Sequence, residues 1–414
     1  MPRIWWGSCF ILICVMALGC GPDTECGEYP LSDQQRQCVV ETIDGMVHES
    51  FPFADYKGVD LDEFSAKLEA TLEADTDDQE FLADVRRAIA KLQDGHTRME
   101  RHYLEDEAPA TAPVGVRDID GDVVIDRVDD PEQAELIGER VDQIDGVKAA
   151  QQLREHQGIT ASVEHTEVAL SGPRLALAGD PGSTLELTLE DGTAVTLQRR
   201  PMHDEPQTRV YDDNIGYLRV DTFGFIDDLE RIDEAINELS DTDGLMIDLR
   251  DNGGGFPSVS EGLFSRLIQE ERSPFRMVDV NDNVHRELPM EPRGDAYEGD
   301  ITLLVNGTTY SASNLVAHRF RYHQRGALVG ESTGGGAASP SNGAMILPGL
   351  WFQVSTHVVR APDGEHRESG IEPDLEVDVE EEVAGVQEGA VGDEFESTGD
   401  PVIDRAILHL NGEE

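Results

Sequence analysis

The clearest pattern of apolar and polar positions lies between about residues 207 and 379, where short apolar runs alternate with amphipathic stretches. The runs Ile215–Val220, Gly244–Leu249 and Ile301–Val305 have the length of buried strands. Between them, residues 229–239 and 259–268 carry apolar side chains at helical spacing. Because strands that alternate with helices in this way form a mainly parallel sheet covered by helices, the pattern predicts an α/β domain over residues 204–380.

The chain before this domain shows two different sequence patterns, one helical and one typical of β-strands. Residues 21–110 repeat apolar positions at helical spacing and predict an N-terminal helical domain. Residues 111–203 contain short alternating runs separated by Asp-Gly turns, with a helical piece near Val147–His156. This β texture resembles a PDZ domain, whose exposed sheet edge accepts a peptide as an added strand. A packing module without a ligand is the alternative interpretation.

The C-terminal end divides into two further parts. Residues 381–399 are acidic and poor in aromatic side chains, which predicts a flexible segment. Asp400-Pro401 then marks the start of a final helix within residues 400–414.

The first residues carry a targeting signal. Arg3 precedes the apolar run Ile4–Leu18, which fits a signal peptide and is short for a transmembrane span. With Gly19-Cys20 at its end, residues 1–20 resemble a bacterial lipoprotein signal, in which Cys20 would be lipidated, although Ala17 stands where Leu is usual. The resemblance implies an exported protein of the bacterial cell envelope that touches the membrane only through this anchor.

Cysteine usage agrees with export. Cys9 and Cys14 would leave with the signal, so Cys26 and Cys38 remain as a possible disulfide pair.

The charge limits the possible partners. Eighty-five acidic residues against 32 basic ones give a formal net charge of -53, which excludes a general nucleic-acid or anionic-membrane surface because phosphates would be repelled. Lysine occurs only at Lys57, Lys67, Lys91 and Lys148. An acidic, lysine-poor surface indicates adaptation to high salt, where screening removes self-repulsion; an ordinary acidic secreted protein is the alternative.

Candidate chemistry is concentrated after the strand Ile301–Val305. Asn306-Gly307 forms a turn, and a helix is expected to begin near Ser311. A hydroxyl at this junction would lie beside the free N–H groups of a helix N-terminus, which can hold a developing oxyanion. A plain helix cap explains the same serine equally well.

Three glycines, Gly253–Gly255, follow the buried strand Gly244–Leu249. A phosphate-binding loop would need Gly-Lys-Ser/Thr at the helix start, and Phe256-Pro257 stands there instead. The glycines therefore mark a tight turn or a close backbone approach to a substrate, where peptide N–H groups suit an oxyanion.

Together these motifs resemble the C-terminal processing (tail-specific) and tricorn core serine protease family. The resemblance extends from about Gln93 to Leu410 and rests on four motifs in order: residues 247–255 (IDLRDNGGG), 311–313 (SAS), 330–333 (GEST) and 370–374 (GIEPD). It implies a crotonase/ClpP-like spiral α/β catalytic domain with a PDZ-like domain attached, and a nucleophile at Ser311. It implies no cofactor or metal, and a protein or peptide substrate.

Departures from the family pattern indicate its branch. The processing-protease branch uses a Lys base about twenty-five residues after the nucleophile, where this chain has Gly336, and no Lys follows Lys148. The tricorn-like branch uses an upstream His, matched by His96 in Asp94-Gly95-His96-Thr97, and a Glu before the last motif. The tricorn pattern has Ser where this chain has Gly95, which leaves a hydroxyl relay at that point open.

The expected site is therefore Ser311 as nucleophile, His96 as base and Glu368 as the orienting carboxylate, with Glu365 as the alternative register. Oxyanion donors would be the N–H of Ala312 and that of Gly254 or Gly255. Asp94 either supports His96 or caps the loop locally.

The sequence thus predicts an exported serine endopeptidase. A non-catalytic ligand- or peptide-binding protein on the same fold is the alternative, and a crotonase-type acyl enzyme is a weaker one.

Overall fold

The computed structural model describes residues 30–101, 110–157, 176–201, 206–386 and 397–413. The signal peptide with Cys20, and Cys26 of the possible disulfide, lie outside these residues, so both stay predictions; Cys38 lies on helix α1 (Asp33–Ser50). Among the described residues, every helix is too short or too polar to cross a membrane.

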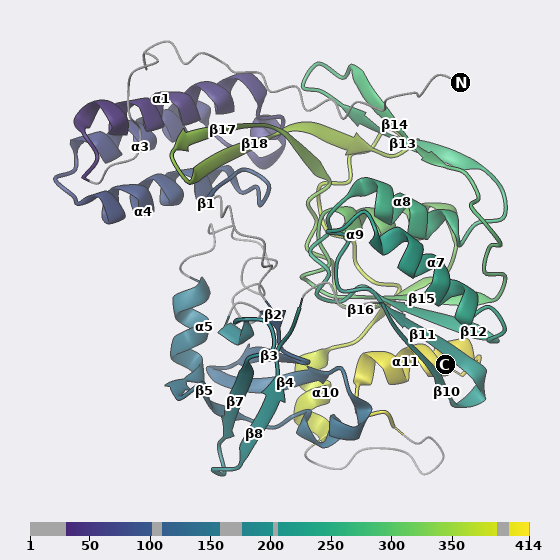
Figure 1. Ribbon diagram of the computed structural model, residues 1–414. Coiled ribbons are helices and arrows are strands. Elements are labelled where there is room, and N and C mark those ends of the chain that lie inside the picture. The colour runs from purple at the N-terminus through teal and green to yellow at the C-terminus, as the bar shows by residue number, and fades with distance from the viewer. Residues whose placement is uncertain (1–29, 102–109, 158–175, 202–205, 387–396, 414) are drawn as a thin grey trace, which may run out of the picture.

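A six-stranded sheet forms the centre of the α/β region (Figure 1), and its strands are parallel except at the β10 edge. Its order is β10 (Gln207–Tyr211), β11 (Ile215–Arg219), β12 (Gly244–Asp248), β15 (Asp300–Val305), β16 (Ala327–Gly330) and β19 (Leu375–Glu376). The mainly parallel sheet confirms the α/β prediction.

Helices cover both faces of this sheet because alternate strand residues point to opposite sides. Leu218 and Ile247 belong to one core, with helices α7 (Asp228–Glu238), α8 (Pro257–Ser265) and α9 (Ala312–His323). Tyr217 and Met246 belong to the opposite core, with helix α11 (Pro401–Leu410). Figure 1 shows α11 on the side of the sheet away from α7, α8 and α9.

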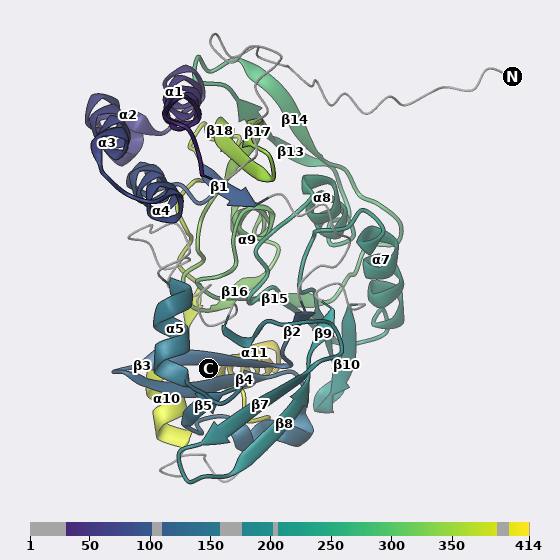
Figure 2. The ribbon, with the colours of Figure 1, turned by 60° about the vertical axis from the view of Figure 1, so that its left-hand side comes forward.

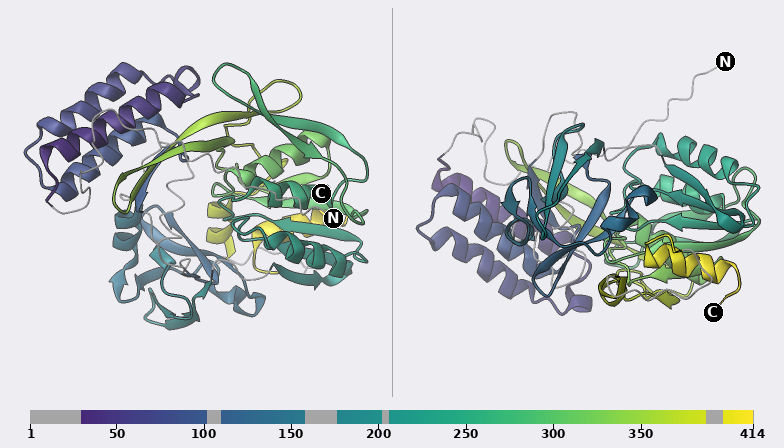
Figure 3. Two further views of the ribbon diagram at one scale, coloured as in Figure 1. Left: turned by 45° about the horizontal axis from the view of Figure 1, so that its top comes forward. Right: turned by 90° about the horizontal axis from the view of Figure 1, so that it is seen from below.

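A second sheet extends as an arch from the α/β region to the N-terminal helices (Figure 3). It runs in the order β1 (Arg98–Arg101), β18 (Leu350–Arg360), β13 (Arg272–Val278) and β14 (Val284–Met290), with β17 (Ala338–Leu347) also paired to β18. The sequence did not predict β13 and β14, because charged and proline positions interrupt their apolar pattern.

The N-terminal helices pack on this second sheet. They are α1, α2 (Ala54–Lys57), α3 (Leu61–Glu73), α4 (Asp78–Ile89) and the 3-10 turn η1 (Ala90–Leu92). Ile43 and Phe81 from the helices share one core with Phe352 and Val354 of β18. The predicted helical domain therefore buries its apolar face against the β17–β18 hairpin rather than forming a core alone.

The β domain has its own core, and Figure 2 shows it below the N-terminal helices. Its strands are β2 (Ala110–Thr111), β3 (Val114–Ile119), β4 (Asp122–Val128), β5 (Val141–Ile144), β6 (Val147–Lys148), β7 (Thr184–Leu189), β8 (Ala194–Gln198) and β9 (Arg200–Pro201). Helix α5 (Ala149–Gln157) covers β5, and η2 (Pro131–Leu136) joins β4 to β5; η3 (Asp212–Asn214) lies outside this domain.

One expectation at the C-terminus differs from the structure. The acidic stretch predicted to be flexible over residues 381–399 begins inside helix α10 (Val379–Val386). Val379 is buried against the core that contains α11, and this burial stabilises a helix that the acidic composition alone does not predict. Asp400 caps α11 by accepting hydrogen bonds from the N–H groups of Val402 and Ile403, as expected for an Asp-Pro helix start.

Candidate active site

Ser311 occupies a strained turn between β15 and α9. Its backbone φ of 60° and ψ of -119° lie in a region that side chains disfavour, and such strain is concentrated at functional sites. Its N–H donates to the carbonyl of Gly335 at 2.9 Å, which holds the turn. The side chain makes no cap hydrogen bond to α9, so the plain-cap interpretation of this serine is wrong.

His96 is buried on the loop that follows η1, and its backbone is fixed on both sides. The N–H of His96 donates to Asp94 Oδ1 at 3.2 Å, and its carbonyl accepts from Gln353 Nε2 at 3.0 Å. Asp94 Oδ2 accepts from Thr97 Oγ1 at 2.5 Å. The hydrogen bonds of Asp94 thus go to the His96 backbone and to Thr97, as in the capping interpretation, while its charge raises the pKa of His96 against the larger, lowering effect of burial.

The two side chains meet although 215 residues separate them. His96 Nε2 lies 2.9 Å from Ser311 Oγ, a hydrogen-bonding distance. Burial lowers the pKa of His96 from 6.5 to about 4, which keeps the imidazole neutral at ordinary pH. A neutral imidazole is the form that can accept a proton from a hydroxyl.

The other ring nitrogen of His96 contacts Tyr310. Tyr310 Oη lies 3.1 Å from His96 Nδ1, and the two rings stack with their centroids 4.9 Å apart. Tyr310 was not among the site residues predicted from the sequence. Its signal was its place directly before Ser311.

Glu368 lies beside the site but does not touch the histidine. Its Oε1 accepts from Lys57 Nζ at 2.8 Å, and Lys57 Nζ also donates to the carbonyl of Gln93 at 2.5 Å. Within the part of the chain that the structure describes, no hydrogen bond joins Glu368 to His96. Lys57 of helix α2 instead contacts the carboxylate, and Tyr310 contacts Nδ1, so the orienting role expected of Glu368 stays a prediction.

The choice between the two glutamates is clear from burial. Glu368 is 6% exposed, whereas Glu365 lies on the surface. Burial raises the pKa of Glu368 to about 7 even though Lys57 lowers it. Lys57, one of only four lysines in the chain, was not predicted from the sequence to belong to the site.

The glycine turn lies against Ser311. A Cβ on Gly254, which has φ +96°, would lie 2.7 Å from Ser311 Cβ. The N–H of Gly254 donates to Asn252 Oδ1 at 2.9 Å, so this amide is already satisfied. Ala312 is the first residue of α9, where N–H groups have no acceptor within the helix. The two N–H groups still expected to bind an oxyanion are therefore those of Gly255 and Ala312.

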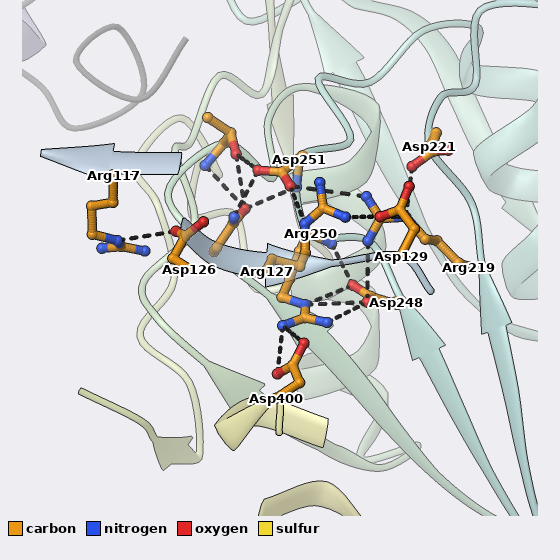
Figure 4. Close-up of polar contacts among 12 residues, drawn as sticks. Arg117, Asp126, Arg127, Asp129, Arg219, Asp221, Asp248, Arg250, Asp251 and Asp400 are labelled. Carbon is orange, nitrogen blue, oxygen red and sulfur yellow. Dashed lines mark hydrogen bonds and ion pairs between the residues drawn. The ribbon is translucent and has the colours of Figure 1, made fainter. Parts of the chain in front are cut away.

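A buried group of charges connects this turn with the β domain (Figure 4). Arg127 Nε of β4 donates to Asp251 Oδ2 at 3.0 Å, and Arg117 of β3 makes two hydrogen bonds to Glu331, at 2.8 and 2.7 Å. Asp251 also accepts from Asn306 and Thr308 of the turn before Ser311. The group comprises Arg117, Asp126, Arg127, Asp129, Arg219, Asp221, Asp248, Arg250, Asp251, Glu331 and Asp400.

These charges surround a cavity of about 60 Å³ that lies between the β domain and the α/β region. The surrounding arginines lower the pKa of Asp251 far below its usual value despite its burial. Asp251 stays ionised there, so its hydrogen bonds connect the glycine turn and the turn before Ser311 to strand β4 of the β domain. A group of three or more side chains suited to a metal ion is absent from the described residues.

Comparisons with known proteins agree with this geometry. Residues 214–377 match the family model of Peptidase family S41. Over 187 residues the chain is 27% identical to the carboxyl-terminal-processing protease of Synechocystis sp., covering 42% of this chain and 42% of that protein. Over 203 residues it is 25% identical to the tricorn protease of Thermoplasma volcanium, covering 47% of this chain and 17% of that protein. Each aligned stretch spans less than half the length of the relative.

Solved structures extend the likeness over most of the fold. The photosystem II D1 C-terminal processing protease aligns with a TM-score of 0.53 at 18% identity, and the alignment covers 83% of this chain and 93% of that protease. Mature CPAF complexed with lactacystin aligns with a TM-score of 0.62 at 13% identity, and the alignment covers 92% of this chain and 100% of the CPAF chain. The chain shares with them a mixed α/β fold with an N-terminal helical region. Its residues 214–377 match peptidase family S41, and its sequence is similar to a carboxyl-terminal-processing protease and to a tricorn protease.

Proposed function

We propose that this chain is a serine endopeptidase in which Ser311 is the nucleophile and His96 the general base. The observation that carries the proposal is the 2.9 Å contact between His96 Nε2 and Ser311 Oγ, made by a serine held in a strained turn. A serine hydroxyl is a weak nucleophile at neutral pH and needs an adjacent base of this kind.

The chemistry is acyl transfer in two steps. Ser311 Oγ attacks the scissile carbonyl carbon while its proton passes to His96 Nε2, and this proton then goes to the leaving amine as the peptide bond breaks. Water attacks the resulting ester, gives its proton to His96, and releases the acid; the proton returns to Ser311 Oγ. The N–H groups of Gly255 and Ala312 would stabilise the negative oxygen in both steps.

The tricorn-like branch suits this chain better than the Ser–Lys branch. No Lys follows Lys148, and position 336 carries Gly. Glu368 is the buried glutamate at the position where this branch is expected to have its carboxylate, and it would act on His96 indirectly, through the residues between them. The crotonase/ClpP-like spiral and the PDZ-like character of the β domain belong to the same proposal.

The proposed substrate is a protein or peptide, and no cofactor is required. The signal at residues 1–20 supports export with a lipid anchor at Cys20 in the bacterial cell envelope. Fluorophosphonate labelling tests the catalytic proposal. We expect the wild type to be labelled and to cleave peptides, Ser311→Ala to do neither, and Ser273→Ala, which changes an exposed serine of β13, to match the wild type. An unlabelled wild type without peptidase activity would instead support the non-catalytic binding protein.

A further inference from the structure

We propose that Tyr310 is the residue that positions His96, supplying at Nδ1 the hydroxyl that Gly95 does not provide. This inference rests on the proposed function, because positioning has meaning only if His96 is the base. The role would make Tyr310 a positioning residue that acts on the substrate through His96.

The contact fixes the tautomer of the base. Nε2 must be free of hydrogen to take the proton of Ser311, so the ring hydrogen of neutral His96 must lie on Nδ1. Tyr310 Oη lies 3.1 Å from Nδ1 and can accept that hydrogen bond. The stacked rings, inclined at 28°, resist rotation of the imidazole about its bond to the chain. One side chain therefore sets both the tautomer and the orientation.

Tyr310 is itself held by the loops that form the rest of the site. Its N–H donates to the carbonyl of Asn252 at 3.1 Å, and its backbone bridges to Gly335. Because Tyr310 and Ser311 are neighbours in the chain, a single turn places the nucleophile and the partner of its base. The distance between Ser311 Oγ and His96 Nε2 is thus fixed by adjacent residues.

The ring of Tyr310 also occupies the space beside position 336. A Cβ on Gly336 would lie 2.0 Å from Tyr310 Cε2, closer than any side chain can approach. In the Ser–Lys branch of the family that the sequence resembles, the lysine base is expected about twenty-five residues after the nucleophile, which is position 336 in this chain. The tyrosine ring and a side chain at position 336 therefore exclude each other, which explains why this chain combines Tyr310, Gly336 and a histidine base.

Tyr310→Phe tests the hydroxyl while keeping the ring. We expect kcat to fall about 10- to 100-fold with KM nearly unchanged, less than the roughly 10⁴-fold loss for an orienting carboxylate, because a neutral acceptor stabilises an imidazolium less. Tyr322→Phe, a change at an exposed tyrosine further along α9, is the matched control and should keep the wild-type kcat.

A spectroscopic readout separates positioning from general damage. In ¹⁵N-histidine NMR at neutral pH, we expect the His96 signal of the wild type to show the Nδ1-protonated tautomer and that of Tyr310→Phe to show a mixture. Gly336→Ala, which displaces the ring and keeps the hydroxyl, should also lower kcat. The proposal is overturned if Tyr310→Phe keeps kcat within twofold, or if the His96 tautomer is unchanged in a folded variant. Activity that survives in Ser311→Ala would instead overturn the proposed function.

Discussion

Neutralising Glu368 should make the protein more stable and less active. Burial raises the pKa of this carboxyl group from 4.5 to about 7, and it does so although Lys57 Nζ lies 2.8 Å away. The folded protein therefore ionises Glu368 less readily than the unfolded chain does. A neutral glutamine at this position avoids that cost and leaves Lys57 its hydrogen bond to the carbonyl of Gln93.

The size and sign of the effect follow from the shift. A group with a raised folded pKa contributes stability below its unfolded pKa and loses it as pH rises through the folded pKa. Each pKa unit corresponds to about 1.4 kcal/mol, so Glu368→Gln should exceed the wild type by up to about 3 kcal/mol above pH 7 and match it below about pH 4.5. Urea unfolding at pH 4.5 and pH 8 measures this difference.

The activity of the same variant tests whether the buried carboxylate of Glu368 assists catalysis. We expect kcat to fall at least about 100-fold, equal to about 2.7 kcal/mol of barrier, if the carboxylate assists His96 through its neighbours. Glu365→Gln, three residues earlier and exposed, should change neither stability nor kcat.

Two results would refute this reasoning. A Glu368→Gln protein that is several kcal/mol less stable at pH 8 would mean that attraction to Lys57 outweighs burial, as in a buried ion pair that loses one partner. A variant that keeps its kcat would make the Lys57–Glu368 pair structural and leave Ser311, His96 and Tyr310 as the whole site.

Two further predictions concern solution conditions. Because neutral His96 and ionised Glu368 are both required, kcat/KM of the wild type should rise with pH through an ionisation near 7. In Glu368→Gln this step should be replaced by one near 4, the lowered pKa of His96. A step that stays near 7 in the variant would exclude Glu368 as its source. The melting temperature should increase from low to molar NaCl, because the net charge of -53 repels itself and salt screens it; a melting temperature that does not respond to salt would contradict adaptation to high salt.

The sequence predicted the parts of the fold that have strong local patterns. The strands β11, β12 and β15 and helices α7 to α9 match the predicted runs to within a few residues, because their apolar periodicity is regular. Strands β13 and β14 were missed because they gain their stability from pairing with each other and with β18, which a local pattern does not show.

The same limit applied to the site. Ser311 and His96 carried recognisable neighbouring residues, so their positions could be predicted although 215 residues separate them. Which group reaches His96 Nδ1 depends instead on a side chain that enters from the nucleophile turn, and Lys57 comes from a four-residue helix with no motif of its own. Contacts of this kind are decided by three-dimensional packing.

The contacts of the N-terminal helices connect them to the proposed site. Lys57 of helix α2 meets Glu368 of the loop after β18, and the core of the helices is continuous with β18. The strand β1 that follows His96 pairs with β18 as well, so one strand anchors the loops of both His96 and Glu368. Ser311 is strained and Glu368 is buried, and each costs stability that the surrounding packing must supply. Because the helices share their core with β18, and β18 pairs with the strand that follows His96, we expect loss of the helices to displace His96 relative to Ser311.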